Sequence, residues 1–265
     1  IAGLSYAKLM KFDAAIDSYK QVLKIKPDDA GAYCNMGNAL RQKGDFEAAL
    51  NSFNQALKIK DDYAGVYYSM GNVFRDKRDL DSAMNHYRQA LKIDPDFAEA
   101  HNNLAGCLTE KGDLEAALNV YTRAAKIKPN YAEAHSNMGN VLQAMGDLNA
   151  AISSYQQALR IKPDLCETYN NMGRALRDKG DLRAAMTSFT QALKIRPGYA
   201  EVYSNIGRAL KGVVFNEPNV AFQELITLLL DSNNYGTPID ISKAAISLLK
   251  FDPVIKELFK KHSSG

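Results

Sequence analysis

The chain has 265 residues, of which 46% are hydrophobic and 24% charged, as is ordinary for a folded domain or repeat array. Its 33 basic and 30 acidic residues give a formal net charge of only +3, which argues against a dedicated nucleic-acid binder. No apolar run approaches the roughly 20 residues that a membrane-spanning helix needs, so no membrane attachment is expected.

The three cysteines, Cys34, Cys107 and Cys166, are far apart and form no Cys-x-x-Cys pair. Neither a disulfide framework nor a zinc site is therefore expected, and a reducing compartment fits better. No signal peptide is visible, so we expect a cytoplasmic protein. Because the chain begins at Ile1 rather than Met, we expect it to be a piece of a longer protein.

A step of 34 residues recurs along most of the chain. It links prolines at Pro95, Pro129, Pro163 and Pro197, with Pro27 in the same register and Asp61 in place of the second proline. It also links small residues: Gly37, Gly71, Ala105, Gly139, Gly173 and Gly207. A third series is aromatic: Phe53, Tyr87, Tyr121, Tyr155 and Phe189. Several registers that agree in this way indicate tandem repeats.

In chain order, the pattern predicts a first unit that lacks its opening residues, five full units and a final first helix. These are 1–29, then 30–63, 64–97, 98–131, 132–165 and 166–199, and finally 200–212. Each full unit is expected to hold two helices, since its apolar residues recur at i, i+3, i+4 and i+7. In unit 98–131 the first helix should bury His101, Leu104, Ala105 and Leu108.

Turn residues predict where these helices begin and end. In unit 98–131, Asp96 with Glu99 reads as a capping box for the first helix, and Asn130/Glu133 and Asp164/Glu167 repeat it. Gly112 should end the first helix and Asp113 should cap the second. Arg78 stands where the other full units have this glycine, so its turn should be strained or differently shaped. Close helix crossings are expected at Gly139 with Ala151 and at Gly173 with Ala185.

Together these positions resemble the tetratricopeptide repeat, a helix–turn–helix unit of about 34 residues, over residues 1–212. The resemblance implies an all-α fold, in which stacked units coil into a right-handed α–α superhelix. It also implies a concave groove lined by first helices that holds a protein or peptide, and no catalysis.

Residues 213–265 leave the register and form a separate C-terminal segment. They predict helices opening at Pro218, around 241–249 and over 254–261. The segment is expected to cap the stack, or to connect it to a further domain. It is also similar to stretches that follow repeat arrays in some bacterial multidomain transferases, including methyltransferases.

Asparagines recur on the side of the first helices that is expected to be exposed. They stand at Asn35, Asn103, Asn137, Asn171 and Asn205, with Ser69 in the second full register. Three residues further on lie Asn38, Asn72, Asn140, Arg174 and Arg208. A carboxamide can pair with the backbone of an extended peptide, so these ten residues, Ser69 aside, are the predicted binding site. The arrangement resembles the asparagine ladder in the superhelix of O-linked N-acetylglucosamine transferases. The alternative is that the asparagines bond between neighbouring helices.

A second, more lateral line of the first helices carries charges, notably Arg41, Arg75 and Arg177 beside Asp76 and Asp178. It is either a solvated face with local ion pairs or a selector of charged ligand side chains. Some relatives hold acidic C-terminal tails of heat-shock chaperones with lysines early in the first helix. Here those early positions carry no lysine, so that clamp is not expected.

No motif for catalysis, a cofactor or a metal is present. His101 and His135 repeat one position and are expected to be core aromatics, and Cys34 is the one thiol expected near the groove. We therefore expect a non-enzymatic scaffold. Two alternatives stay open: the substrate-recognition region of a larger glycosyltransferase or methyltransferase, and a scaffold that self-assembles through its end helices.

Overall fold

The computed structural model describes residues 2–211, 213, 214 and 247, with side chains from residue 11 onward. Within this part, the regular secondary structure is entirely α-helical. The helices predicted over 213–265 lie almost wholly outside the described residues, so the division of the chain at residue 212 stays a prediction, as do the superhelix and its hand.

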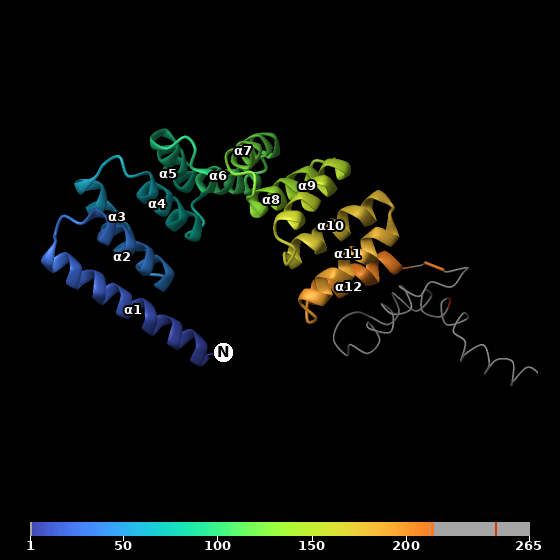
Figure 1. Cartoon of the computed structure of the whole chain (residues 1–265), viewed down its shortest axis with the longest axis horizontal. Helices are drawn as coiled ribbons and strands as arrows, with labels where there is room; N and C mark the ends of the chain where they lie inside the picture. Colours follow the sequence, from blue (N-terminus) through green and yellow to red (C-terminus); the bar gives the residue numbers. More distant parts are fainter. Residues whose placement is uncertain (1, 212, 215–246, 248–265) are drawn as a thin grey trace, which may run out of the picture. The chain divides into compact units, whose positions relative to one another are not determined.

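The chain divides into two compact units, Ile1–Asn137 and Met138–Gly265, which are described separately (Figure 1). The helices of the first unit are α1 (Ala2–Ile25), α2 (Ala30–Lys43), α3 (Phe46–Ile59), α4 (Ala64–Asp76), α5 (Leu80–Ile93), α6 (Ala98–Glu110) and α7 (Leu114–Ile127). Helix α8 (Ala132–Ala144) crosses the boundary. The second unit continues with α9 (Leu148–Ile161), α10 (Cys166–Lys179), α11 (Leu182–Ile195) and α12 (Ala200–Leu210).

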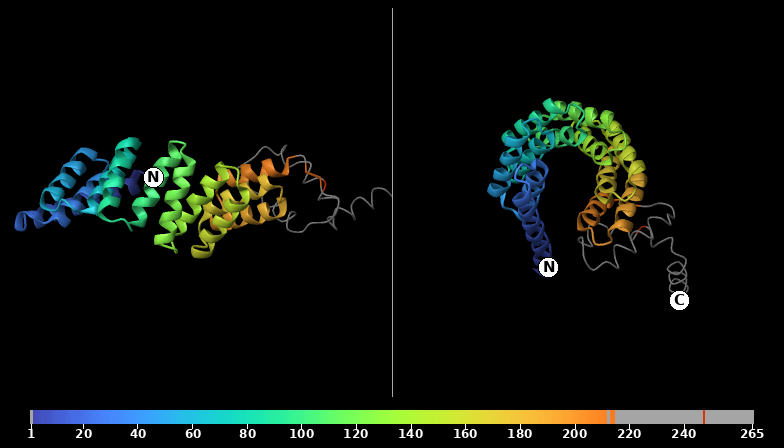
Figure 2. Two further views of the ribbon diagram at one scale, coloured as in Figure 1. Left: turned by 90° about the horizontal axis from the view of Figure 1, so that it is seen from above. Right: turned by 60° about the vertical axis from the view of Figure 1, so that its left-hand side comes forward.

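Each repeat is an antiparallel pair of helices, and the pairs stack in chain order within a unit. In the first unit α2 packs on α3, α4 on α5 and α6 on α7, and the hairpins join where α1 contacts α2, α3 contacts α4 and α5 contacts α6. In the second unit α10 packs on α9 and α11, and α12 packs on α11 and α10. Figure 2 shows the paired helices side by side. The described chain is therefore an all-α solenoid of tandem helical hairpins, as predicted.

The second helices are capped as the sequence predicts. Asp113 accepts a hydrogen bond from the backbone N–H of Ala116 at 3.2 Å, and an aspartate does the same at the start of every second helix from α3 to α11. This bond satisfies one of the backbone donors that a helix start leaves unpaired.

The capping boxes predicted for the first helices are wrong where the helix starts are described in full. Helix α6 begins at Ala98 after Phe97, so Asp96 lies too early to cap it and pairs with Arg123 at 3.1 Å instead. Glu99 turns to Lys128 at 2.7 Å, and this hydrogen bond lowers the pKa of its carboxyl. At α10 the residue before the helix is Leu165, without a side-chain cap, and Glu167 pairs with Arg196.

The turns inside the repeats need a left-handed residue. Gly44, Gly112, Gly146 and Gly180 have φ between 85° and 92°. Arg78 fills the same place with φ 65°, and it is the one non-glycine residue with positive φ among those described. The turn thus keeps its shape, and the predicted strain falls on Arg78, because a side chain there crowds the backbone.

In the four hairpins with glycine at the crossing, the close contact is made by glycine and an aromatic ring, not by glycine and alanine as predicted. A Cβ added to Gly139 would lie 2.6 Å from Cε1 of Tyr155, and one added to Gly173 would lie 2.5 Å from the same atom of Phe189. Gly37 meets Phe53 and Gly71 meets Tyr87 in the same way. These four rings are fully buried, so they are the centre of each hairpin core. Ala151 and Ala185 are also fully buried, but the ring sets the distance.

Replacing Arg78 by glycine should stabilise the protein. Glycine adopts positive φ without steric cost, so we expect the free energy of unfolding to rise by about 0.5–1 kcal/mol after the entropic cost of glycine. Urea denaturation followed by circular dichroism measures it. The reverse change, Gly146→Arg at φ 87°, is the control and should destabilise; a loss of stability in Arg78→Gly would contradict the strain.

Gly139→Ala should destabilise by roughly 1–3 kcal/mol, because the new methyl overlaps the ring of Tyr155. Gly106→Ala is the matched control, since its Cβ would meet nothing closer than the Tyr121 hydroxyl at 3.6 Å. There the better helix propensity of alanine should stabilise by up to about 1 kcal/mol. Thermal unfolding of both variants decides; equal shifts in one direction would show that the ring contact is unimportant.

Candidate peptide-binding surface

We call the predicted asparagine positions of the first helices the row. Four of its asparagines, Asn103, Asn137, Asn171 and Asn205, bond to the first helix of the preceding repeat. In the first unit, Nδ2 of Asn103 donates to Oδ1 of Asn72 at 2.9 Å and to the hydroxyl of Tyr68 at 3.1 Å. Oδ1 of Asn103 accepts from Asn102 at 3.2 Å, and Asn102 in turn accepts from Asn137 at 3.2 Å. The alternative of bonds between neighbouring helices is thus realised.

The second unit repeats the arrangement. Nδ2 of Asn171 donates to Oδ1 of Asn140 at 2.9 Å. Nδ2 of Asn205 donates to Oδ1 of Asn170 at 2.9 Å, and Asn170 donates to Glu201 at 3.2 Å. Asn205 is only 1% exposed, so the prediction that it lies on the exposed side is wrong. Its neighbours in the row are half-buried or exposed.

The acceptor of each bond follows a simple rule. In each preceding repeat, one further asparagine stands near the row position. Asn72 and Asn140 lie three residues after it, and Asn102 and Asn170 lie one residue before it. The row asparagine of the next repeat donates to this further asparagine. Where Ser69 breaks the row, Asn38 instead lies 3.8 Å from Sγ of Cys34, and Asn35 is exposed.

Buried tyrosines of the second helices reach into the row. The hydroxyl of Tyr87 donates to Oδ1 of Asn72 at 2.7 Å. That of Tyr155 lies 2.8 Å from Oδ1 of Asn140 and 3.0 Å from Oε1 of Gln143. Burial raises the pKa of both phenols, so they remain protonated donors. Sequence reasoning missed these partners, although the Tyr/Phe alternation in the aromatic series marks them.

Several amides keep unused hydrogen-bonding groups on the solvent side. Asn137 and Asn171 each use one N–H, and Asn72 and Asn140 use only their oxygens. Among the described residues, the one buried side-chain nitrogen or oxygen without a partner is Nε of Arg41. Nδ2 of Asn72 and the oxygens of Asn137 and Asn171, which have no protein partner, are therefore open to water, and Asn140 is exposed as a whole. Asn103 is the exception, because both of its N–H groups are taken.

Charged side chains of the lateral line pair across repeats. Arg41 contacts Asp76 at 2.7 Å, Arg75 contacts Glu110 at 3.5 Å, and Gln143 donates to Asp178 at 3.5 Å. Each pair joins one first helix to the next. The expectation of a solvated face with ion pairs is therefore confirmed for Arg41 and Arg75.

The histidines and cysteines offer no reactive centre. His101 and His135 are half-buried rather than core residues, and Nε2 of each lies about 3 Å from the carbonyl oxygen of Pro95 or Pro129 (2.9 and 3.1 Å). Sγ of Cys34 lies 3.8 Å from Nδ2 of Asn38, but Cys34 is only 7% exposed and burial raises the pKa of its thiol, which disfavours reactivity. Within the described chain no cluster of three metal-ligating side chains occurs.

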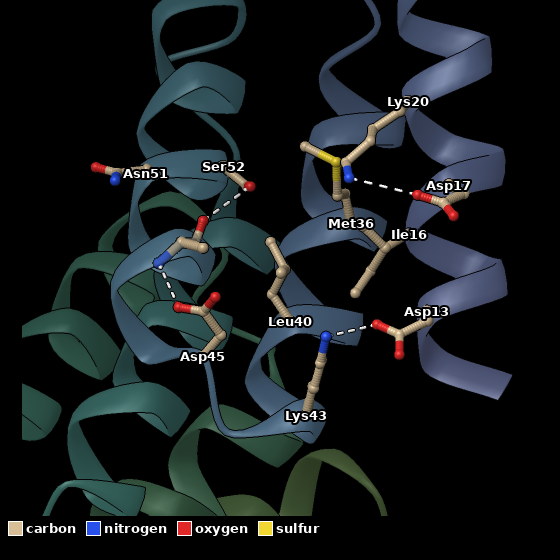
Figure 3. A pocket seen from close by; sticks show the side chains of 11 residues that line it. Asp13, Ile16, Asp17, Lys20, Met36, Leu40, Lys43, Asp45, Asn51 and Ser52 are labelled. Atoms are coloured by element: carbon tan, nitrogen blue, oxygen red, sulfur yellow. Dashed lines mark hydrogen bonds and ion pairs between the residues drawn. The ribbon is translucent and has the colours of Figure 1, made fainter. Parts of the chain in front are cut away.

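A pocket of about 430 Å³ lies away from the row, between α1, α2 and α3 (Figure 3). Ile16, Met36 and Leu40 line it, and its rim holds the ion pair of Lys43 with Asp13 at 2.6 Å. One repeat later the residues equivalent to Leu40 and Ser52 are Phe74 and His86, whose rings stack with centroids 4.8 Å apart. In that repeat the two rings occupy the positions that Leu40 and Ser52 have at the pocket.

Asn171→Ala should cost about 1 kcal/mol of stability, because it leaves Asn140 without its partner from the next helix. Asn35→Ala is the matched control, since Asn35 is exposed and the same gain in helix propensity applies. Chemical denaturation of both variants measures the difference. If the two variants lose the same stability, the amide bond contributes nothing to the stack.

Comparison with known proteins gives the family of the repeats. The model described as "TPR repeat" matches residues 3–40, 37–77, 71–105 and 108–146, and the model described as "Tetratricopeptide repeat" matches residues 130–198. No curated protein matches the chain. None of the described helices is both long and apolar enough to cross a membrane.

Solved structures share the fold. MamA is 26% identical, with a TM-score of 0.56 over 63% of this chain and 97% of its own. YrrB, described as "a TPR protein with an unusual peptide-binding site", is 23% identical, with a TM-score of 0.57 over 71% and 97%. PilF of Pseudomonas aeruginosa is 19% identical, with a TM-score of 0.63 over 95% and 99%. The family models together cover well over half of the chain, which therefore belongs to the tetratricopeptide repeat family.

Proposed function

We propose that the chain is a scaffold that binds an extended segment of another protein along its first helices, without catalysis of its own. The observation that carries this proposal is the row of amides that are bonded on one edge and open to solvent on the other. In the first unit the proposed contacts are Asn35, Asn38, Asn72 and Asn137. In the second unit they are Asn140, Asn171, Arg174 and Arg208.

The bonds between repeats favour binding rather than oppose it. An asparagine that is already held by its neighbour loses little rotamer freedom when a ligand arrives, so less of the interaction energy is spent on ordering it. Asn137 and Asn171 keep one N–H and the oxygen, which match the C=O and N–H of a peptide backbone. Asn103 and Asn205 are better explained as supports of the row, since one is fully bonded and the other buried.

The spacing of the row suits an extended ligand. Packed helices lie about 8–10 Å apart and a strand rises about 3.3 Å per residue, so one repeat corresponds to about three ligand residues. Each backbone bond contributes only about 0.5–1.5 kcal/mol, so affinity requires several repeats together.

The compartment is part of the same proposal. The three cysteines are free, and all three are buried. Burial raises the pKa of each thiol, which slows oxidation. Unpaired thiols of this kind fit a reducing environment such as the cytoplasm.

Asn72→Asp and Asn140→Asp test the binding role separately from the structural one. Aspartate keeps the oxygens that accept from tyrosine and asparagine, but it removes the N–H groups that are open to solvent. Peptides selected from a random 12-residue library should bind each variant about 2- to 10-fold more weakly, as fluorescence anisotropy would measure.

The control variants are Asn51→Asp and Asn85→Asp, which make the same change at exposed positions of second helices. They should bind like the unchanged protein. A library that yields no binding peptide, or an equal loss in test and control variants, would refute the proposed function.

A further inference from the structure

The lateral line of the first unit is electrically balanced. Its two cations face two acids of the next repeat, as Arg41 with Asp76 and Arg75 with Glu110. These pairs leave no spare charge on the first helices α2, α4 and α6 at these positions. The lateral line of the first unit therefore offers no unpaired charge to a ligand.

In the second unit the arginine of the lateral line is paired within one helix rather than between repeats. Arg177 bonds to Asp178 on its own helix, at 2.7 Å from Nη2 and 3.0 Å from Nε. In the sequence register that pairs Arg41 with Asp76 and Arg75 with Glu110, Arg177 corresponds to Gly212 rather than to an acid. Asp178 is thus shared between Arg177 and Gln143.

Two further cations stand in the row itself. Arg174 and Arg208 occupy the positions where three other repeats have Asn38, Asn72 and Asn140. Neither has a carboxylate within 4 Å in the described part of the chain, and Arg208 contacts only the hydroxyl of Ser204 at 3.2 Å. The nearby Glu167 is held by Arg196, and Glu201 by Asn170.

Arg174 lies next to the amides of the row. Burial raises the pKa of the Tyr155 phenol, and the positive charge of Arg174 acts in the opposite direction. The hydroxyl of Tyr155 donates to Asn140. Asn171 bonds to the same oxygen of Asn140. A carboxylate that reached Arg174 would therefore lie beside amides with unused donors, as a charged ligand in a binding row requires.

We propose that the second unit selects an acidic segment of its partner, whose aspartate or glutamate side chains pair with Arg174 and Arg208. This inference rests on the proposed function and names the ligand class. The proposed ligand presents carboxylates of side chains inside its sequence. This differs from the clamp for C-terminal tails, whose lysines stand early in the first helix, where this chain has Glu167 and Glu201.

The test uses three 12-residue peptides blocked at both ends, in which glutamate, glutamine or lysine alternates with glycine and serine. Fluorescence anisotropy with the whole chain should give tightest binding for the glutamate peptide. Its affinity should fall as salt rises from 50 to 500 mM, because exposed charges are screened. A 12-nucleotide single strand of uridines serves as competitor; displacement of the peptide by it at lower concentration would overturn the choice of a protein partner.

The decisive variants are Arg174→Gln with Arg208→Gln, against Arg41→Gln with Arg75→Gln. Both pairs remove two positive charges and so lower the net charge equally. The second pair also breaks the contacts with Asp76 and Glu110, so its thermal unfolding is measured alongside. The first pair should weaken binding of the glutamate peptide roughly 4- to 25-fold, since each exposed ion pair contributes about two- to fivefold. The second pair should leave it within about twofold.

The outcomes separate the two claims. Equal affinity for the glutamate and glutamine peptides, with losses in Asn140→Asp, would refute acid selection and leave the proposed scaffold standing. Equal losses in the two arginine pairs would refute the location. No binding of any library peptide would refute the scaffold itself, and acid selection with it.

Discussion

The contact on which the rest of the structure depends is an aromatic ring lying on the bare backbone of a glycine. At Gly71 and Gly139 the ring atoms come so close that even a methyl group would overlap them. The two helices of a hairpin can therefore pack closely. A tyrosine of the second helix then spans the core, and its hydroxyl reaches the first helix. Tyr87 and Tyr155 do this, and their hydroxyls hold Asn72 and Asn140. Core packing thus orients the amide row.

The amide row joins stability and recognition in the same side chains. A buried amide must be bonded, and four row asparagines, Asn103, Asn137, Asn171 and Asn205, meet this need by donating to the preceding repeat. A carboxamide has more bonding groups than one neighbour uses, so an amide at the edge of the core can support the stack and still face solvent. The two interpretations of the asparagines that the sequence allows are therefore compatible, and only Asn103 and Asn205 fall wholly on the structural side.

Local chemistry explains which predictions held. The 34-residue step predicts the hairpins because buried positions recur with it. The cap at Asp113 and the helix end at Gly112 are predicted because both depend only on neighbouring backbone groups. The capping box at Asp96 failed because a shift of one residue in the helix start, which makes Phe97 the N-cap, is invisible in a periodic pattern. Lys128 instead offers Glu99 a partner 29 residues away. The partners of the asparagines were missed for the same reason: Asn171 and Asn140 are 31 residues apart and meet only once the hairpins stack.

The positions at which the repeats differ in sequence are those that can distinguish one ligand from another. A perfect array would present the same amides in every repeat and would bind any backbone alike. In this chain the balanced pairs Arg41–Asp76 and Arg75–Glu110 cancel the charge of the first unit. Arg174 stands where Asn140 stands one repeat earlier, and it adds a charge that no acid of the described chain neutralises. The repeated amide positions thus supply affinity for any peptide backbone. The positions that differ between repeats supply the preference for one ligand, because only they distinguish between side chains of the partner.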